Sequence, residues 1–149
     1  LMPGKGYSFM YTPPSDMKLE HAALLLEARV AVTPMNGKIR FGGTMELGSP
    51  NNKIYQNRVE GIVNSIPKYL TNLDVEYPKQ DIWYGYRPCT PDGLPYLGRT
   101  AKYENLAIAA GAGMMGLSLG PAMGKAISDI FSNRKFETNI TLFSPDRFG

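Results

Sequence analysis

The stretch from Glu104 to Asn133, ENLAIAAGAGMMGLSLGPAMGKAISDIFSN, has the pattern of a strand, a glycine loop and a helix. Leu106 to Ala110 is a short apolar run without charge, which is typical of a buried strand. Gly120-Pro121 is placed to open the helix, because the missing N–H of proline is not needed in a first helical turn. A glycine loop that leads into a helix N-terminus presents free backbone N–H groups and a positive dipole end. The stretch therefore predicts a site for an electron-rich ligand.

The glycines Gly111-x-Gly113-x-x-Gly116 match the dinucleotide-binding fingerprint, but their context argues against that interpretation. A dinucleotide fold needs a second parallel strand and an acidic residue about 20 positions further on. Glu137 has nearly that spacing, yet the sequence reaches Gly149 before such a fold could be completed. The alternative is a tightly packed glycine turn, for which small residues are available at Ala122, Gly124 and Ala126.

A second motif is an arginine at the end of the strand that we predict from Asp81 to Arg87, followed directly by Pro88. A guanidinium in an apolar setting is costly unless it has an anionic partner, and its geometry suits a carboxylate bound through two parallel hydrogen bonds. Arg87 therefore predicts an anionic partner, for which a carboxylate is suited. A structural salt bridge to one of the 13 acidic residues is the alternative.

Composition excludes several classes of function. The chain has 149 residues and a net charge of +3 without a basic cluster, so we do not expect nucleic-acid binding. The one cysteine, Cys89, cannot form an internal disulfide and fits a reducing compartment, and with the one histidine, His21, it cannot assemble a metal site. No apolar segment approaches the roughly 18 residues that would span a bilayer. We expect a cytoplasmic protein, with peripheral association at the inner face of the membrane as an alternative.

The remaining sequence predicts a sheet with one packed helix. An Asn36-Gly37 hairpin separates two of the predicted strands, and Pro67 bends or ends the helix. The predicted strands and extended pieces are Tyr7–Tyr11, Leu24–Thr33, Lys38–Leu47, Leu73–Tyr77 and Phe136–Phe143, and the helix runs from Ile54 to Leu70. Pro88 to Gly98, rich in proline and glycine, is predicted as a crossing segment. The fold class is therefore α+β.

Four motifs in order resemble the C-terminal half of the flavin-dependent D-amino-acid oxidase family, and most of all its D-amino-acid dehydrogenase and glycine oxidase branch. The motifs are Lys5–Ser8, Ile39–Glu46, Trp83–Gly98 and Asn105–Gly116. The resemblance implies that residues 1–84 are a portion of the substrate domain, with an antiparallel or mixed sheet. It also implies that residues 85–149 return to an FAD-binding domain as its closing strand, glycine loop and helix. In that family the dinucleotide fingerprint lies in the N-terminal half, which is absent from this chain.

The resemblance also implies roles for the two motifs. The late glycine loop lies beside the pyrimidine edge of a non-covalently bound flavin, and the residues carried over are Gly111, Gly113, Met114, Met115, Gly116 and Leu117. Arg87 pairs with the carboxylate of the amino-acid substrate, and Tyr86 is taken with it. The implied reaction is hydride transfer from the α-carbon of a D-amino acid or a glycine-like substrate to flavin N5, giving an imino acid, without a catalytic side chain or a metal. The electrons pass on to an acceptor such as a quinone.

Some positions depart from the family pattern. Relatives often carry an aromatic substrate contact in the strand that corresponds to Glu27–Val32, a histidine at the place of Ala112, or an arginine at the place of Met114. The substrate side chain is therefore left open. Because FAD is bound mainly by the missing half, we expect this chain alone to be inactive and to bind FAD weakly. The alternative function is a stand-alone ligand-binding or interaction domain without redox activity.

Overall fold

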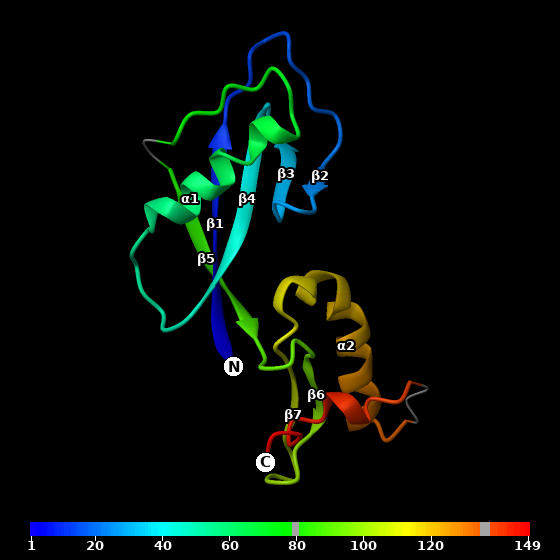
Figure 1. Cartoon of the computed structure of the whole chain (residues 1–149). Coiled ribbons are helices and arrows are strands. Elements are labelled where there is room, and N and C mark those ends of the chain that lie inside the picture. The colour runs from blue at the N-terminus through cyan, green and yellow to red at the C-terminus, as the bar shows by residue number, and fades with distance from the viewer. Residues whose placement is uncertain (79–80, 135–137) are drawn as a thin grey trace. The chain divides into compact units, whose positions relative to one another are not determined.

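The computed structural model describes residues 1–78, 81–134 and 138–149. The chain divides into two compact units (Figure 1). One unit is Lys5–Tyr86, and the other consists of Arg87–Gly149 with the first four residues, Leu1–Gly4. The predicted α+β class is confirmed, with antiparallel strand pairs and two α-helices in the described part of the chain.

The Lys5–Tyr86 unit is built on a five-stranded sheet in the order β2-β3-β4-β1-β5. The strands are β1 (Met2–Tyr11), β2 (Ala23–Leu25), β3 (Val30–Met35), β4 (Lys38–Leu47) and β5 (Trp83–Cys89). The predicted hairpin is confirmed, because Asn36 and Gly37 both have positive φ, 52° and 74°, and Met35 pairs with Lys38. Two central residues with positive φ match the right-handed twist of the flanking strands, which is why Asn-Gly is favoured there.

The strand predicted from Leu24 to Thr33 is wrong as a single element. β2 ends at Leu25, and β3 begins at Val30, so the two strands form a second hairpin in which Leu25 pairs with Val30. Its turn is closed by a hydrogen bond from the Arg29 N–H to the Leu26 carbonyl at 3.2 Å, with Arg29 at a φ of 54°. The sequence gives no glycine, proline or asparagine to mark this turn, so only the tertiary pairing reveals it.

The predicted helix is split in two. α1 (Gln56–Val63) is followed by a 3₁₀ turn, η1 (Ile66–Lys68), that contains Pro67. A proline in a helix interior removes a backbone hydrogen bond, so the α-helix ends before it, and the Ser65 hydroxyl donates to the Ile62 carbonyl at 2.7 Å.

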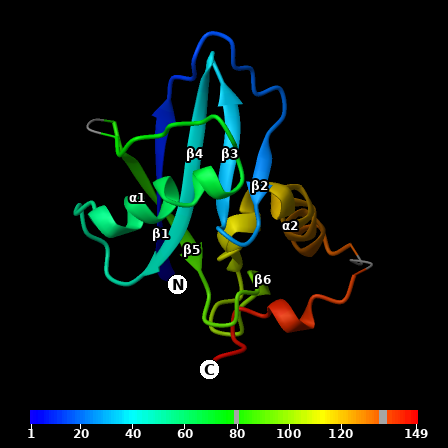
Figure 2. The same cartoon turned by 45° about the horizontal axis from the view of Figure 1, so that its top comes forward.

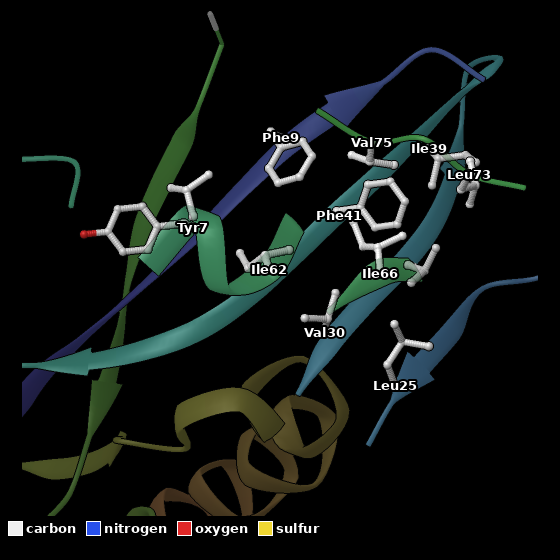
Figure 3. Close-up of a cluster of buried hydrophobic side chains, with 12 residues drawn as sticks. Tyr7, Phe9, Leu25, Val30, Ile39, Phe41, Ile62, Ile66, Leu73 and Val75 are labelled. Atoms are coloured by element: carbon white, nitrogen blue, oxygen red, sulfur yellow. The ribbon is translucent and has the colours of Figure 1, made fainter. Parts of the chain in front are cut away.

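The helix lies across one face of the sheet (Figure 2). Val59, Ile62 and Ile66 are fully buried there, as their helical spacing predicts. They pack in one cluster with side chains from three strands and from the chain after the helix, drawn in Figure 3: Tyr7, Phe9, Val30, Ile39, Phe41, Leu73 and Val75.

The Arg87–Gly149 unit contains a two-stranded antiparallel sheet of β6 (Tyr96–Arg99) and β7 (Ala107–Ala110). The strand predicted before the glycine loop is thus confirmed as β7, but it is half-buried to exposed and not buried as predicted. The crossing segment Pro88–Gly98 also holds the start of an unpredicted strand, β6. A 3₁₀ turn η2 (Gly113–Met115) leads into α2 (Gly116–Phe131), which packs its Met123 and Ala126 against Leu97. Of the predicted extended tail, Phe136 and Glu137 lie outside the described residues, and Thr141–Phe143 forms another 3₁₀ turn, η3.

The helix begins at Gly116 and not, as predicted, at Pro121, which lies inside it. A proline at this position removes the hydrogen bond that its N–H would donate to the carbonyl of Leu117, four residues earlier. Leu117 is 95% exposed and Pro121 is also exposed, so the proline lies on the solvent side of the helix.

An arginine near the end of the chain connects the loops of this unit through hydrogen bonds and a ring contact. Arg147 donates two hydrogen bonds of 2.9 Å to the two oxygens of Asp92, and its guanidinium lies 4.2 Å from the centroid of the Tyr96 ring. Arg147 holds the pKa of the Asp92 carboxyl at about 2, below its ordinary value of 3.8. Asp146 adds a second tie by accepting hydrogen bonds from the Ala101 N–H and the Thr100 hydroxyl at 2.6 and 2.7 Å.

Candidate functional site

The turn that follows β7 can be made only by glycine. Gly111 has a φ of +79°, and a Cβ atom at this position would come within 2.5 Å of the Thr90 side chain and 2.8 Å of the Leu1 side chain. The next residue, Ala112, forms a bridge with Cys89, so the end of β5 runs beside the turn. The glycine is thus required by its backbone conformation and by close packing.

The glycine loop leads into a helix N-terminus that has no side-chain cap. The Met115 N–H bonds to the Ala112 carbonyl at 2.9 Å inside the 3₁₀ turn. The helix α2 that follows has no side-chain cap and no acidic residue in its first turn. The first N–H groups of a helix have no intrahelical acceptor, so they are available here to an acceptor outside the helix. The positive end of the helix dipole favours negative charge at the same place.

A hollow of about 350 Å³ lies beside this N-terminus. Its lining is Pro88, Met123, and glycines and alanines between Ala109 and Gly124, without a charged or hydrogen-bonding side chain. Added Cβ atoms at Gly120 and Gly124 would meet nothing within 4 Å, so these glycines leave open space in place of tight packing. Gly116 has an ordinary helical φ of −56°, so its missing side chain also serves clearance and not backbone strain. The lining suits an uncharged group that takes its hydrogen bonds from backbone donors.

The structure separates the predicted loop residues into two groups. Gly111, Gly113 and Gly116 line the hollow. Met114, Met115 and Leu117 do not line it, and their exposed fractions are 71%, 56% and 95%. If the loop binds a ligand, it therefore does so through its backbone, while these three side chains present an apolar surface.

Arg87 lies on β5 and is half-buried, and its Nη1 nitrogen is buried without a hydrogen-bond partner in the described part of the chain. Among those residues Arg87 also takes part in no ion pair, unlike Arg134 and Arg147. A buried charged donor without an acceptor is costly, so the structural salt bridge considered for Arg87 finds no support in the described residues. The unpartnered nitrogen is available to an anionic group that the chain itself does not supply.

Tyr86, the other candidate, directs its hydroxyl elsewhere. Its oxygen accepts a hydrogen bond from the Asn51 N–H at 2.7 Å, and the hydroxyl donates to the Asn51 carbonyl. Successive side chains of a strand point to opposite faces, so the Tyr86 ring and the Arg87 guanidinium leave β5 on opposite sides. The structure does not bring these two groups together.

A buried charged residue of the Lys5–Tyr86 unit was not predicted from the sequence. Lys5 belongs to the first motif, yet no role was predicted for it. In the structure it is 1% exposed, and the rings of Tyr7 and Tyr84 flank its ammonium group. The sequence carries no signal for this burial, because Lys5 lies between Gly4 and Gly6, before the strand predicted from Tyr7 to Tyr11.

Two other observations bear on the type of site. The described residues contain no group of three or more His, Cys, Asp or Glu side chains that could hold a metal ion. None of the helices within the described ranges is long and apolar enough to cross a membrane.

Comparison with known proteins assigns this architecture. Residues 1–130 match the family model described as DAO, FAD dependent oxidoreductase. The D-amino acid dehydrogenase of Helicobacter pylori is 31% identical over 146 residues, which are 97% of this chain and 35% of that protein. The D-amino acid dehydrogenase of Bradyrhizobium diazoefficiens is also 31% identical, over 98% of this chain and 34% of its own length. The chain belongs to the DAO family of FAD-dependent oxidoreductases.

Solved structures agree with this assignment. Glycine oxidase from Geobacillus kaustophilus is similar with a TM-score of 0.83 and 25% identity, over 99% of this chain and 39% of that one. Iminodiacetate oxidase from Chelativorans sp. BNC1 has a TM-score of 0.80 at 20% identity, over 96% of this chain and 39% of its own, and supports the fold alone. The chain spans about a third of the length of the curated relatives it matches.

The family implies FAD, and the residues present fit the ring of that cofactor. The isoalloxazine is uncharged and its pyrimidine edge carries acceptor atoms, and these features suit a hollow without charged side chains beside an uncapped α2 N-terminus. No acidic side chain in the first helical turn opposes negative charge there. The open space at Gly120 and Gly124 leaves clearance for a ring.

Proposed function

We propose that the protein containing this chain is an FAD-dependent oxidoreductase that oxidises the amine of an amino acid, either a D-amino acid or a glycine-like substrate. In this proposal Arg87 binds the substrate carboxylate, and the backbone of Gly113–Leu117 faces the pyrimidine edge of the flavin. The observation that carries the proposal is the buried Nη1 of Arg87, which lacks a partner among the described residues. An amino-acid carboxylate supplies the missing acceptor.

Each group has a defined task. Arg87 orients the substrate through charge-assisted hydrogen bonds, so that the α-carbon is held in one position. Pro88 restricts the backbone of Arg87 to extended conformations, which limits how far the guanidinium can move. The hydroxyl of Tyr86 is engaged by Asn51, so a substrate contact through that hydroxyl is not part of the proposal.

The glycine loop stabilises negative charge on the flavin through its backbone and not through a side chain. The N–H groups at the start of α2 and the positive dipole end stabilise negative charge at the adjoining ring edge, which raises its electron affinity. FAD, when bound, supplies the acceptor for the two electrons that leave the substrate amine. We assign no side-chain nucleophile or base. We place the reaction in the cytoplasm, with oxygen, a quinone or another protein as the final electron acceptor.

The test is Arg87→Ala in the intact protein, with Arg58→Ala on the exposed side of α1 as the matched control. Loss of a charge-assisted carboxylate contact costs on the order of 2–5 kcal/mol, and we expect it as a raised KM for the amino acid. The flavin-to-protein ratio of Arg87→Ala should stay at the parent's value. Unchanged kinetics with an amino-acid substrate would assign Arg87 to structure. A colourless intact protein would favour a binding domain without redox activity.

A further inference from the structure

The ammonium group of Lys5 is enclosed by aromatic rings. Its Nζ lies over four tyrosine rings, at centroid distances of 4.5 Å for Tyr84, 5.3 Å for Tyr7, 5.7 Å for Tyr55 and 5.9 Å for Tyr86. Lysine forms no ion pair here among the described residues, and Glu46 reaches the cage only by accepting a hydrogen bond from the Tyr7 hydroxyl at 3.2 Å. A fully buried lysine without a paired carboxylate is rare, so the surroundings must stabilise the cation in another way.

The cation is satisfied by one loop. Nζ donates hydrogen bonds to the Asn51 carbonyl at 3.0 Å, to the Asn51 side-chain Oδ1 at 3.1 Å and to the Lys53 carbonyl. An ammonium has three donors, and these are three acceptors. The same Oδ1 accepts from the Lys53 N–H at 3.0 Å, which closes the loop on itself. The segment between β4 and α1 is therefore folded around Lys5.

This loop has little else to hold it. Residues 48–53 form no strand or helix, and all of them except the half-buried Asn51 are exposed. A segment without buried apolar contacts depends on its polar ties for its order. Lys5 supplies ties that start from the rigid interior of β1.

The same loop is hydrogen-bonded to two tyrosines of β5. Asn51 exchanges hydrogen bonds with the Tyr86 hydroxyl through both its N–H and its carbonyl, and Asn52 accepts from the Tyr84 hydroxyl at 3.0 Å. Tyr86 is the residue immediately before Arg87. A continuous series of contacts thus runs from Lys5 through Asn51 to the residue that precedes the proposed carboxylate-binding arginine.

We propose that Lys5 is a positioning residue for substrate binding, acting through Asn51 and Tyr86 on the strand end that carries Arg87. The inference rests on the function proposed for Arg87. A cation is needed because it both satisfies three oxygen acceptors and is attracted to the faces of the tyrosine rings. An apolar side chain of similar length would leave the loop carbonyls without their donor and release the hold on Tyr86.

The experiment is Lys5→Met in the intact protein, with Lys53→Met as the matched control. Lys53 lies in the same loop and contributes its backbone only, so its side chain can be exchanged without touching the cage. A displacement of about 1 Å at a binding group can cost a factor of about 100. For Lys5→Met we expect KM for the amino acid to rise roughly tenfold to a hundredfold, with kcat and flavin content near the parent's values. Lys53→Met should match the parent.

Combination with Arg87→Ala separates positioning from general destabilisation. If Lys5 acts through Arg87, Lys5→Met should raise KM little further in the Arg87→Ala background, because coupled residues are non-additive. Should Arg87→Ala itself leave KM unchanged, the proposed function fails. Should Arg87→Ala raise KM while Lys5→Met alone changes it less than twofold, or adds its full effect in the double variant, the positioning role is overturned.

A gentler variant keeps the test decisive if Lys5→Met does not fold. Tyr86→Phe removes the hydroxyl that Asn51 grips and leaves the cation in place. We expect it to raise KM several-fold in the parent and not in Arg87→Ala. An unchanged KM in Tyr86→Phe would contradict the series of contacts.

Discussion

Different interactions stabilise the interior of each of the two units. The Lys5–Tyr86 unit has twelve buried apolar side chains in one cluster, whereas the Arg87–Gly149 unit has three among its described residues, Leu97, Met123 and Ala126. The second unit relies instead on carboxylates bound by cations and backbone donors. A core of three side chains contributes little hydrophobic stabilisation, so its loops depend on polar contacts for their positions.

Aspartates supply these contacts. Lys125 and then Arg134 hold the pKa of Asp129 below its ordinary value, and the Ala101 N–H and the Thr100 hydroxyl do so for Asp146. The Asp92 carboxyl is gripped by Arg147. In this unit ion pairs and hydrogen bonds hold the loops, while Met114 and Leu117 of the glycine loop are exposed. The comparison therefore predicts that different perturbations weaken each unit.

Truncation in the apolar core should have the largest effect. Phe41 is fully buried and packs with Phe9 at a ring separation of 5.7 Å. Phe41→Ala should lower the free energy of unfolding by about 3–5 kcal/mol. Denaturant unfolding followed by the fluorescence of Trp83, the single tryptophan of the chain, measures it in the chain itself. Leu26→Ala, at an exposed turn, is the control. A loss below about 1 kcal/mol for Phe41→Ala would mean that this core does not dominate its unit.

A backbone substitution in the glycine turn should have an intermediate effect. Gly111→Ala places a Cβ atom against Thr90 at a positive φ, and strain of this kind costs on the order of 1–3 kcal/mol. Gly124→Ala is the matched control, because its Cβ meets nothing within 4 Å and alanine favours a helix interior. Hydrogen exchange at the β6 and β7 amides should report the loss in Gly111→Ala. Equal protection in both variants would contradict the close approach at Gly111.

Acid should loosen the Arg87–Gly149 unit before the other. The pKa of Asp92 is lower in the folded state, so its ion pair stabilises the fold above the ordinary pKa near 3.8. That contribution is lost as pH falls from about 4 toward 2. We expect β6 and β7 amides to lose hydrogen-exchange protection in this range while β3 and β4 amides keep theirs. Arg147→Met should show the same loss already at neutral pH, and simultaneous loss in both units during acidification would argue against the contrast.

Local sequence signals predicted the elements that follow local rules. Asn36-Gly37 fixed a hairpin because both residues tolerate positive φ, and the helical spacing of Val59, Ile62 and Ile66 identified the buried face of α1. The turn at Leu26–Arg29 was missed because its residues carry no turn signature and its geometry comes from strand pairing. Elements determined by neighbouring residues could therefore be predicted, whereas a turn determined by strand pairing could not.

The candidate site was predicted in outline only. The glycine loop and Arg87 could be named from the sequence because their residue types imply their chemistry. The start of α2 at Gly116 could not, since the helix accommodates Pro121 in its interior and not in its first turn. Nor could the Lys5 cage, whose acceptors at Asn51 and Lys53 are more than 40 positions away along the chain. The roles of the loop residues and of Arg87 stay predictions.

The most direct test of the account is the flavin midpoint potential of Gly116→Val compared with Met114→Leu in the intact protein. Gly116 has helical φ and lines the hollow, so valine fills the proposed ring site without backbone strain, whereas the Met114 side chain is exposed. The account predicts a lower midpoint potential and a lower flavin-to-protein ratio for Gly116→Val, because the ring edge is moved away from the helix N-terminus. Met114→Leu should keep both at the parent's values. If Gly116→Val also keeps both, the glycine loop is ordinary packing and does not face the flavin.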